Sequence, residues 1–167
     1  PPRDHFQSFV QLYTRSMERI DADQYYFFSD DYFTGLSRLV ERNGYLMAAE
    51  VDDRWVGAAV FLAGPSRLHY HLAATDSENR VPGVMNLLLY TAAQLAARNG
   101  LRQLHLGGGR TRMPDDSLLR FKQSIGTDSH SFHVGKRVHD SVSYLRLRAL
   151  WEECYPSLVQ KYGQRLL

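Results

Sequence analysis

A lysine inside a short amphipathic helix is the first residue in this sequence that could do chemistry. Lys122 follows Phe121 in a helical pattern that begins after Asp115 and Asp116, with Ser117 as the expected N-cap. A lysine among apolar neighbours can present a fixed positive charge to a phosphate or to a developing oxyanion. The alternative is a surface lysine whose stem covers its apolar neighbours while its ammonium stays in water.

Three consecutive glycines precede that helix. Gly107, Gly108 and Gly109 follow a short strand expected over residues 101–106. Glycines after a strand let the backbone splay and let a ligand approach closely. They are not a P-loop, because no Gly-Lys-Ser/Thr follows, and their spacing does not match a dinucleotide fingerprint. A substrate-binding turn and a plain flexible turn both remain open.

A third feature lies between a strand and a long helix. Residues 80–85 partly match the Arg/Gln-x-x-Gly-x-Gly/Ala loop with which GNAT enzymes hold the pyrophosphate of coenzyme A. A helix N-terminus after a loop offers backbone N–H groups to a phosphate. Met85 stands where that loop has a small residue, and Pro82 removes one donor. The residues expected to bind the donor are Arg80, Gly83, Val84 and Met85.

Three histidines lie on neighbouring strands. His69 and His71 are two apart on one strand and therefore face the same side, and His105 lies on the next strand. No Asp, Glu or Cys completes a ligand set with them, so we expect no metal site. We expect His71 to act as a catalytic base and Tyr70 to contact substrate. A half-buried strand histidine is the alternative interpretation.

The elements that must position these residues follow from periodicity and turn signals. Helices are expected over residues 4–20, 31–42, 82–99 and 117–124, and strands over residues 45–51, 55–62, 68–75, 101–106 and 131–138. One final helix carries the apolar stripe Tyr144, Leu147, Trp151, Tyr155, Leu158 and Tyr162. This order predicts a mixed α/β (α+β) sheet flanked by helices. Its third and fourth strands splay beside the helix that starts near residue 82.

Composition fits an ordinary globular chain. Of 167 residues, 44% are hydrophobic and 23% charged, and the net charge is +2. Residues 1–100 hold 9 Lys/Arg against 12 Asp/Glu, whereas residues 101–167 hold 11 against 6. The last third is thus where a phosphate-bearing partner would be attracted, although a solvated basic helix face is equally consistent. The single cysteine, Cys154, excludes an internal disulfide. We expect a cytoplasmic protein without a membrane span.

The order of the motifs resembles a known family. Residues 70–76 read Tyr-His-Leu-Ala-Ala-Thr-Asp, a proline opens a helix that ends in Asn-Gly, residues 106–109 read Leu-Gly-Gly-Gly, and residues 116–122 read Asp-Ser-Leu-Leu-Arg-Phe-Lys. Over about residues 25–135 this is similar to the second GNAT-like domain of the Fem-like family, which includes the aminoacyl-tRNA-dependent ligases of peptidoglycan cross-bridges. The resemblance implies a functional lysine at Lys122, near the acyl end of the donor. We expect Phe121, beside it, to contact substrate.

The resemblance implies transfer of an acyl or aminoacyl group from acyl-CoA or aminoacyl-tRNA, used as a co-substrate, to an amine of a small molecule or peptide. No tightly bound cofactor and no DNA partner are expected. Fem-like ligases pair two such domains, and this chain opens on Pro-Pro and holds one over residues 1–167. It is therefore expected to be a single-domain relative or the second domain of a longer protein. The alternative function is a catalytically silent module that binds tRNA or a partner protein.

Overall fold

The computed structural model describes residues 3–111, 113 and 115–162. The chain forms two compact units, Pro1–Ser129 and His130–Leu167. The first unit contains the sheet and every residue that the sequence singles out for chemistry. No helix in the described part of the chain is both long and apolar enough to cross a membrane.

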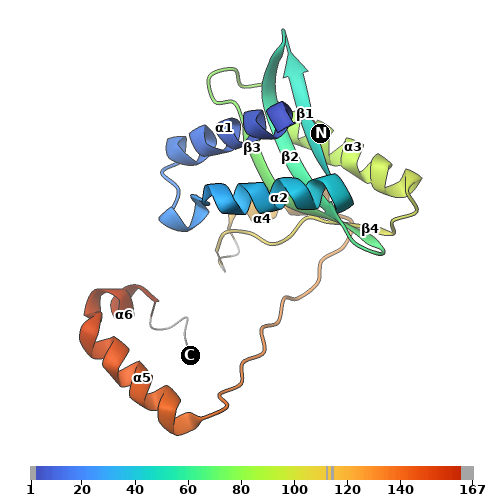
Figure 1. Cartoon of the computed structure of the whole chain (residues 1–167). Coiled ribbons are helices and arrows are strands. Elements are labelled where there is room, and N and C mark those ends of the chain that lie inside the picture. Colours follow the sequence, from blue (N-terminus) through green and yellow to red (C-terminus); the bar gives the residue numbers. More distant parts are fainter. Residues whose placement is uncertain (1–2, 112, 114, 163–167) are drawn as a thin grey trace. The chain divides into compact units, whose positions relative to one another are not determined.

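The first unit is built on a four-stranded mixed sheet (Figure 1). Its strands, β1 (Gly44–Val51), β2 (Arg54–Ala63), β3 (Arg67–Thr75) and β4 (Gln103–His105), lie side by side in chain order. β1–β2 and β2–β3 pair antiparallel, and β3–β4 pair parallel. The mixed sheet flanked by helices that the sequence predicted is confirmed.

Strands β3 and β4 pair for only three residues and then separate. The ladder joins Arg67, Leu68 and His69 to Gln103, Leu104 and His105. Beyond this ladder β3 continues to Thr75, whereas β4 ends at His105 and leads into the three glycines at 107–109, here called the glycine segment. The parallel pair is connected by α3 (Val84–Arg98), as expected for a β-α-β crossover. The predicted splay is confirmed.

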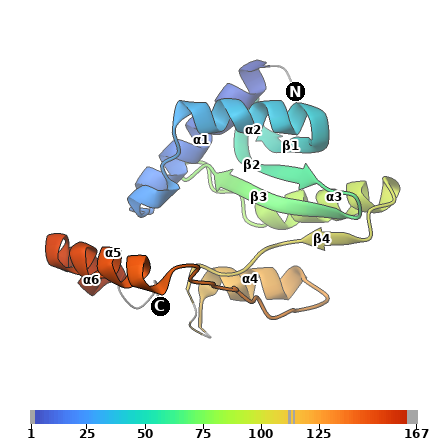
Figure 2. The ribbon, with the colours of Figure 1, turned by 60° about the horizontal axis from the view of Figure 1, so that its bottom comes forward.

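Helices cover both faces of the sheet. α1 (Arg3–Arg19) and α2 (Asp30–Asn43), joined through the 3-10 turn η1 (Gln24–Tyr26), lie on one face, and α3 lies on the other (Figure 2). Each face has its own apolar core. The α1–α2 core contains Phe6, Phe9, Leu12, Tyr13, Phe33, Leu36, Val40, Ala58, Val60 and Ala74. The α3 core contains Ala59, Phe61, Leu68, Leu88, Leu89, Ala92 and Ala96. Burying each large apolar side chain contributes about 1.5–3 kcal/mol.

Local signals explain most element boundaries. The Ser29 hydroxyl accepts from the Tyr32 N–H at 3.3 Å and caps α2, whose first turn carries two aspartates that suit the helix dipole. The start of α3 was predicted two residues too early. Gly83 takes a left-handed conformation, with φ at 78°, so Pro82 lies outside the helix and Val84 begins it.

The second unit holds α5 (Ser141–Cys154) and α6 (Pro156–Tyr162). The single final helix that the sequence predicted is broken at Tyr155, because the ring of Pro156 disfavours a helical conformation in the preceding residue. The predicted strand over residues 131–138 is wrong, since these residues form neither helix nor strand. Alternating apolar residues make a strand only when another strand supplies hydrogen bonds.

Candidate functional site

Lys122 lies on α4 (Ser117–Ile125), beside the glycine segment. Its Nζ donates to the carbonyl oxygen of Gly108 at 2.8 Å and lies 5.5 Å from the ring centroid of Tyr70. The side chain is half-buried, and burial lowers the pKa of the ammonium, an effect that the charge of Asp116 partly opposes. Three residues predicted separately from the sequence therefore meet at one point.

Asp116 fixes the position of α4 against the glycine segment. Its Oδ1 accepts from the Leu119 N–H at 2.8 Å, which makes Asp116 the N-cap in place of the predicted Ser117. Its Oδ2 accepts from the backbone N–H groups of Arg110 and Thr111 at 2.9 and 2.8 Å. These bonds, led by that from Leu119, lower the pKa of the carboxyl from 3.8 to about 2. One carboxylate thus joins the loop to the helix that carries the lysine.

The glycines of the loop have different structural requirements. Gly107 has φ at 72°, a conformation that side chains other than glycine rarely adopt. At Gly109 an added Cβ would come within 2.6 Å of Oδ1 of Asp116, whereas at Gly108 it would meet nothing within 4 Å. The tight loop around Asp116 therefore needs glycine at the first and third positions.

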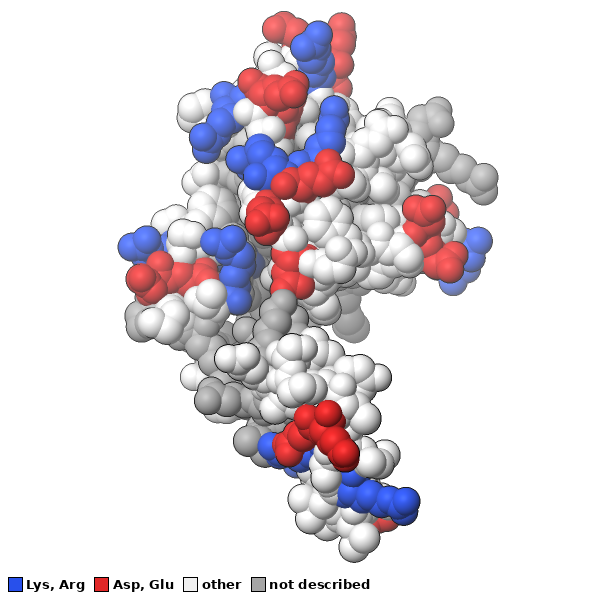
Figure 3. Space-filling model, turned by 90° about the vertical axis from the view of Figure 1, so that its left-hand side faces the viewer, with Lys and Arg blue, Asp and Glu red and all other residues white. Residues whose placement is uncertain are grey.

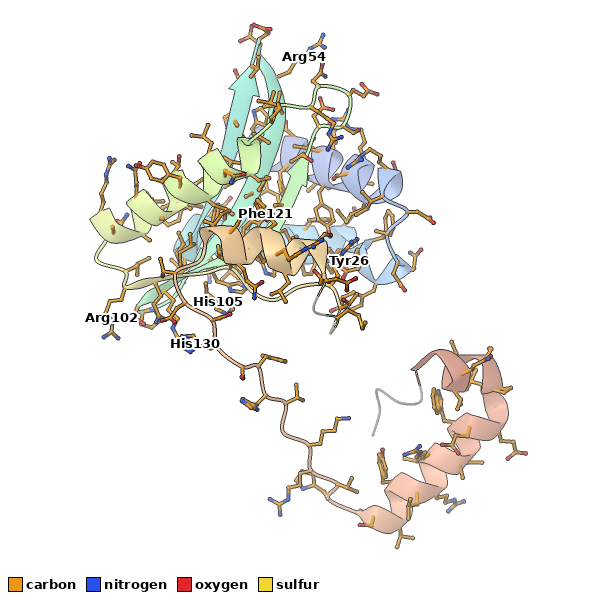
Figure 4. All side chains as sticks on the ribbon, turned by 180° about the vertical axis from the view of Figure 1, so that it is seen from behind. Tyr26, Arg54, Arg102, His105, Phe121 and His130 are labelled. Atoms are coloured by element: carbon orange, nitrogen blue, oxygen red, sulfur yellow. The ribbon has the colours of Figure 1, made fainter. Side chains whose placement is uncertain are left out.

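Phe121 and Tyr70 connect the Lys122 site to the apolar core. Both pack against the α3 core, and Figure 4 shows Phe121 on α4 near the sheet. Burial raises the pKa of Tyr70 to about 12, so its hydroxyl stays protonated over the physiological range. Phe121, which the sequence predicted to contact substrate, packs against the α3 core and is next to Lys122 in the sequence.

His71 is the extra residue of a β-bulge. The β2–β3 register runs from Phe61 opposite Tyr70 to Val60 opposite Leu72 and passes over His71. Its Nε2 lies 2.7 Å from the hydroxyl of Tyr32, which comes from α2. Burial raises the pKa of Tyr32 and lowers that of His71. Burial thus favours the neutral form of both groups, and the tyrosine hydroxyl donates to Nε2 in the tautomer of the imidazole that carries its proton on Nδ1.

Sequence reasoning did not identify Tyr32. It lies in the first turn of α2, 39 residues from His71, and its spacing carries no signal of this contact. Its ring stacks on Phe28 with centroids 4.1 Å apart, and this stacking holds the hydroxyl in place.

The other two histidines form a pair across β3 and β4. Nδ1 of His69 lies 2.7 Å from Nδ1 of His105, and their rings stack with centroids 4.9 Å apart. The pKa of His69 is lowered by burial first and then by the charges of His105, His71 and Lys122. The rings of His69 and His71 lie 6.0 Å apart, on the same side as predicted. In the described residues no three His, Cys, Asp or Glu side chains are placed to hold a metal ion.

The predicted phosphate loop, residues 80–85, lies near the start of β2, away from the Lys122 site. Arg80 lines a cavity of about 540 Å³ together with Asp52, Arg54 and Glu78. Figure 4 shows Arg54 at the end of the sheet opposite His105. The structure does not bring Arg80 into contact with Lys122.

The start of α3 offers backbone groups rather than side chains. Val84 is buried against Gly57, and Met85 packs on the α3 core. No side chain caps the helix at Gly83. The large Met85 side chain thus fits a position where the family loop has a small residue, because it points into the protein.

One face of the molecule carries charges of both signs, which would not favour a partner of either charge. On the face in Figure 3, Lys/Arg and Asp/Glu side chains are intermixed.

The comparisons with known proteins agree on one fold family. A family model described as acetyltransferase (GNAT) domain matches residues 3–123. No curated protein matches the sequence.

Three solved structures illustrate the likeness. An aminoglycoside acetyltransferase from an uncultured soil metagenomic sample, in complex with sisomicin, has a TM-score of 0.61 and 17% identity, over 81% of this chain and 91% of that one. AAC(6')-Iy in complex with a coenzyme A bisubstrate analogue has a TM-score of 0.61 and 12% identity, over 83% and 94%. Ribosomal-protein-alanine N-acetyltransferase from Brucella melitensis biovar Abortus 2308 has a TM-score of 0.58 and 18% identity, over 81% and 94%.

The TM-scores of these structures support the fold alone. The family match covers most of the chain, including the sheet, the crossover helix and Lys122. The chain belongs to the GNAT acetyltransferase domain family.

Proposed function

We propose that this protein is an N-acyltransferase that moves an acyl group from a coenzyme A thioester to an amine. The observation that carries the proposal is the meeting of Lys122, Tyr70 and the glycine segment beyond the point where the β3–β4 pairing ends. The structural neighbours support the reaction class, because they include acetyltransferases and a complex with a coenzyme A bisubstrate analogue.

Lys122 would stabilise the oxyanion that forms at the acyl carbonyl. Its ammonium has three N–H donors, of which one is bonded to Gly108. Burial among Tyr70 and the loop strengthens its field at the reaction centre, because little water screens it. Asp116 and the glycines hold the lysine in position.

The Tyr32–His71 pair would remove the proton from the attacking amine. The amine nitrogen forms a bond to the carbonyl carbon, and the carbon–sulfur bond breaks to release thiolate, which then takes a proton from solvent. The amine proton passes to the oxygen of Tyr32 as the tyrosine proton passes to Nε2 of His71, across their 2.7 Å hydrogen bond. The proton count balances, and His71 later returns its proton to solvent.

The donor would be held at the start of α3. The backbone N–H groups of Gly83 and Met85, together with the helix dipole, suit a pyrophosphate. The Val84 N–H instead donates to the Val81 carbonyl, and Arg80 lies three residues before Gly83. Calorimetry with coenzyme A tests this. Affinity should fall in Arg80→Ala and stay unchanged in Arg38→Ala, an exposed arginine on α2.

A second donor, aminoacyl-tRNA, is favoured by one observation. The cavity beside Arg80 contains the carboxylates Asp52 and Glu78, and Pro82 lacks an N–H donor, so this loop is a poorer pyrophosphate site than the family pattern. The resemblance of Phe121-Lys122 to the Fem-like ligases supports the same donor. Binding of charged tRNA without binding of coenzyme A would select it.

The decisive experiment measures release of free thiol from acetyl-coenzyme A in the presence of a panel of amines. Amine-dependent release that disappears in Lys122→Ala supports the proposal. If neither acyl-CoA nor aminoacyl-tRNA transfers its acyl group to any amine, the proposal fails. The alternative function, a catalytically silent module that binds tRNA or a partner protein, would then be favoured.

A further inference from the structure

A second cavity lies at the start of the parallel pair β3–β4. It measures about 230 Å³ and is lined by Ser66, Arg67, Arg102 and Gln103. The Arg102 N–H donates to the Ser66 carbonyl at 2.8 Å, which joins the two strand entries. Figure 4 shows Arg102 and His105 at the same end of the sheet.

The lining of this cavity is cationic. It contains two guanidinium groups and no carboxylate, and within the described residues neither arginine is ion-paired. The cavity beside Arg80 differs, because Asp52 and Glu78 line it. A guanidinium presents a planar fork of donors that matches a carboxylate or a phosphate. The cavity therefore suits an anionic group.

One face of β3 leads from this cavity to the candidate site. Arg67, His69 and His71 occupy alternate positions, and the register places Gln103 beside Arg67 and His105 beside His69. The ring contacts of His69 with His105 and with His71 confirm the shared face. At about 3.3 Å per residue, the Cα atoms of Arg67 and His71 are about 13 Å apart. β3 and β4 carry no Asp or Glu.

We propose that the acceptor is an amine with an anionic group about 10 Å away along an extended chain. Arg67 and Arg102 bind the anion, a carboxylate or a phosphate, while the amine lies at the Tyr32–His71 pair. The inference rests on the proposed function for the position of the amine. It also disfavours polycationic acceptors, because Arg67, Arg102 and Lys122 would repel them.

Matched acceptors test the charge requirement. Triglycine spans about 10 Å between its amine and its carboxylate, and triglycine amide differs only in lacking that negative charge. We expect a KM for triglycine at least about tenfold lower than for the amide, in the range of a charged hydrogen bond. A third arm, 6-aminohexyl phosphate, distinguishes a phosphate from a carboxylate, since whichever anion has the lower KM is the preferred source.

The variant Arg67→Gln/Arg102→Gln should raise the KM for triglycine to that for triglycine amide and leave the amide unaffected. Arg38→Gln is the matched control, and thermal melting should show all variants folded. Equal KM values for triglycine and its amide, or an unchanged double variant, would overturn the inference.

Calorimetric binding of triglycine separates this inference from the proposed function. Binding that needs both arginines, without acyl transfer from any donor, would retain the anion site and refute the enzyme. Transfer to amines without any preference for an anionic acceptor would retain the enzyme and refute the anion site.

Discussion

The hydroxyl of Tyr32 lies 2.7 Å from Nε2 of His71, and this contact joins the first turn of α2 to the bulge of β3. Burial raises the pKa of the tyrosine and lowers that of the histidine, which favours the neutral form of both groups. The hydroxyl donates to Nε2 in the neutral tautomer that carries its proton on Nδ1, which is the tautomer that the proposed proton transfer requires.

The first prediction concerns the pH profile. In the proposed mechanism His71 is a base with a lowered pKa, so kcat/KM should be constant near neutral pH and fall only as pH drops below the ordinary histidine value of 6.5. Tyr32→Phe removes a hydrogen bond to the neutral form, so the pKa should rise and the acid limb should move to higher pH. His71→Gln should lower kcat by roughly 10²–10⁴-fold and abolish that limb. An unshifted pH profile of kcat/KM in Tyr32→Phe would exclude proton transfer through Tyr32 to His71.

The second prediction concerns Lys122. Lys122→Ala should lower kcat about a hundredfold or more, the range for loss of one oxyanion donor. Lys122→Arg should recover only part of the lost activity, because a planar guanidinium replaces a compact ammonium. Since the half-buried lysine bonds to Gly108, the alanine variant should also lose about 0.5–1.5 kcal/mol of stability. Lys122→Met keeps the apolar stem, so an inactive but stable methionine variant would assign the defect to the charge.

The third prediction concerns Asp116. Its folded pKa of about 2 lies below the ordinary 3.8, so its contribution to stability is present above pH 3.8 and is lost as pH falls through 2. Asp116→Asn should lower the melting temperature at neutral pH and flatten the acid dependence in that window. Asp115→Asn, at an exposed neighbour, is the control. An identical acid dependence in wild type and Asp116→Asn would show that this carboxylate does not hold the loop.

The fourth prediction compares two glycines. Gly109→Ala places a Cβ within 2.6 Å of the Asp116 carboxylate and should destabilise the protein by about 1–3 kcal/mol. Gly108→Ala meets nothing within 4 Å and should be tolerated. Denaturant melts of the two variants measure the difference, and comparable losses would contradict the packing of this loop around Asp116.

The sequence by itself determined most of the elements of the first unit. Helical and alternating periodicities located α1, α2 and β1–β3, because each depends on neighbours a few residues away. The crossover from β3 to β4 followed from element order, and the splay follows because the glycine segment ends the pairing. The motif order also predicted the GNAT family that the comparisons found.

The tertiary structure alone decided which side chains meet. Tyr32 contacts His71 across 39 residues and His69 contacts His105 across 36, and neither contact has a local pattern. The segment 131–138 has the alternation of a strand but no strand partner, so it forms none. Asp116, rather than Ser117, is the N-cap of α4, and its second oxygen accepts from the backbone N–H groups of Arg110 and Thr111, just after the glycine segment. Such choices depend on hydrogen bonds between segments brought together by packing, and a single stretch of sequence does not contain them.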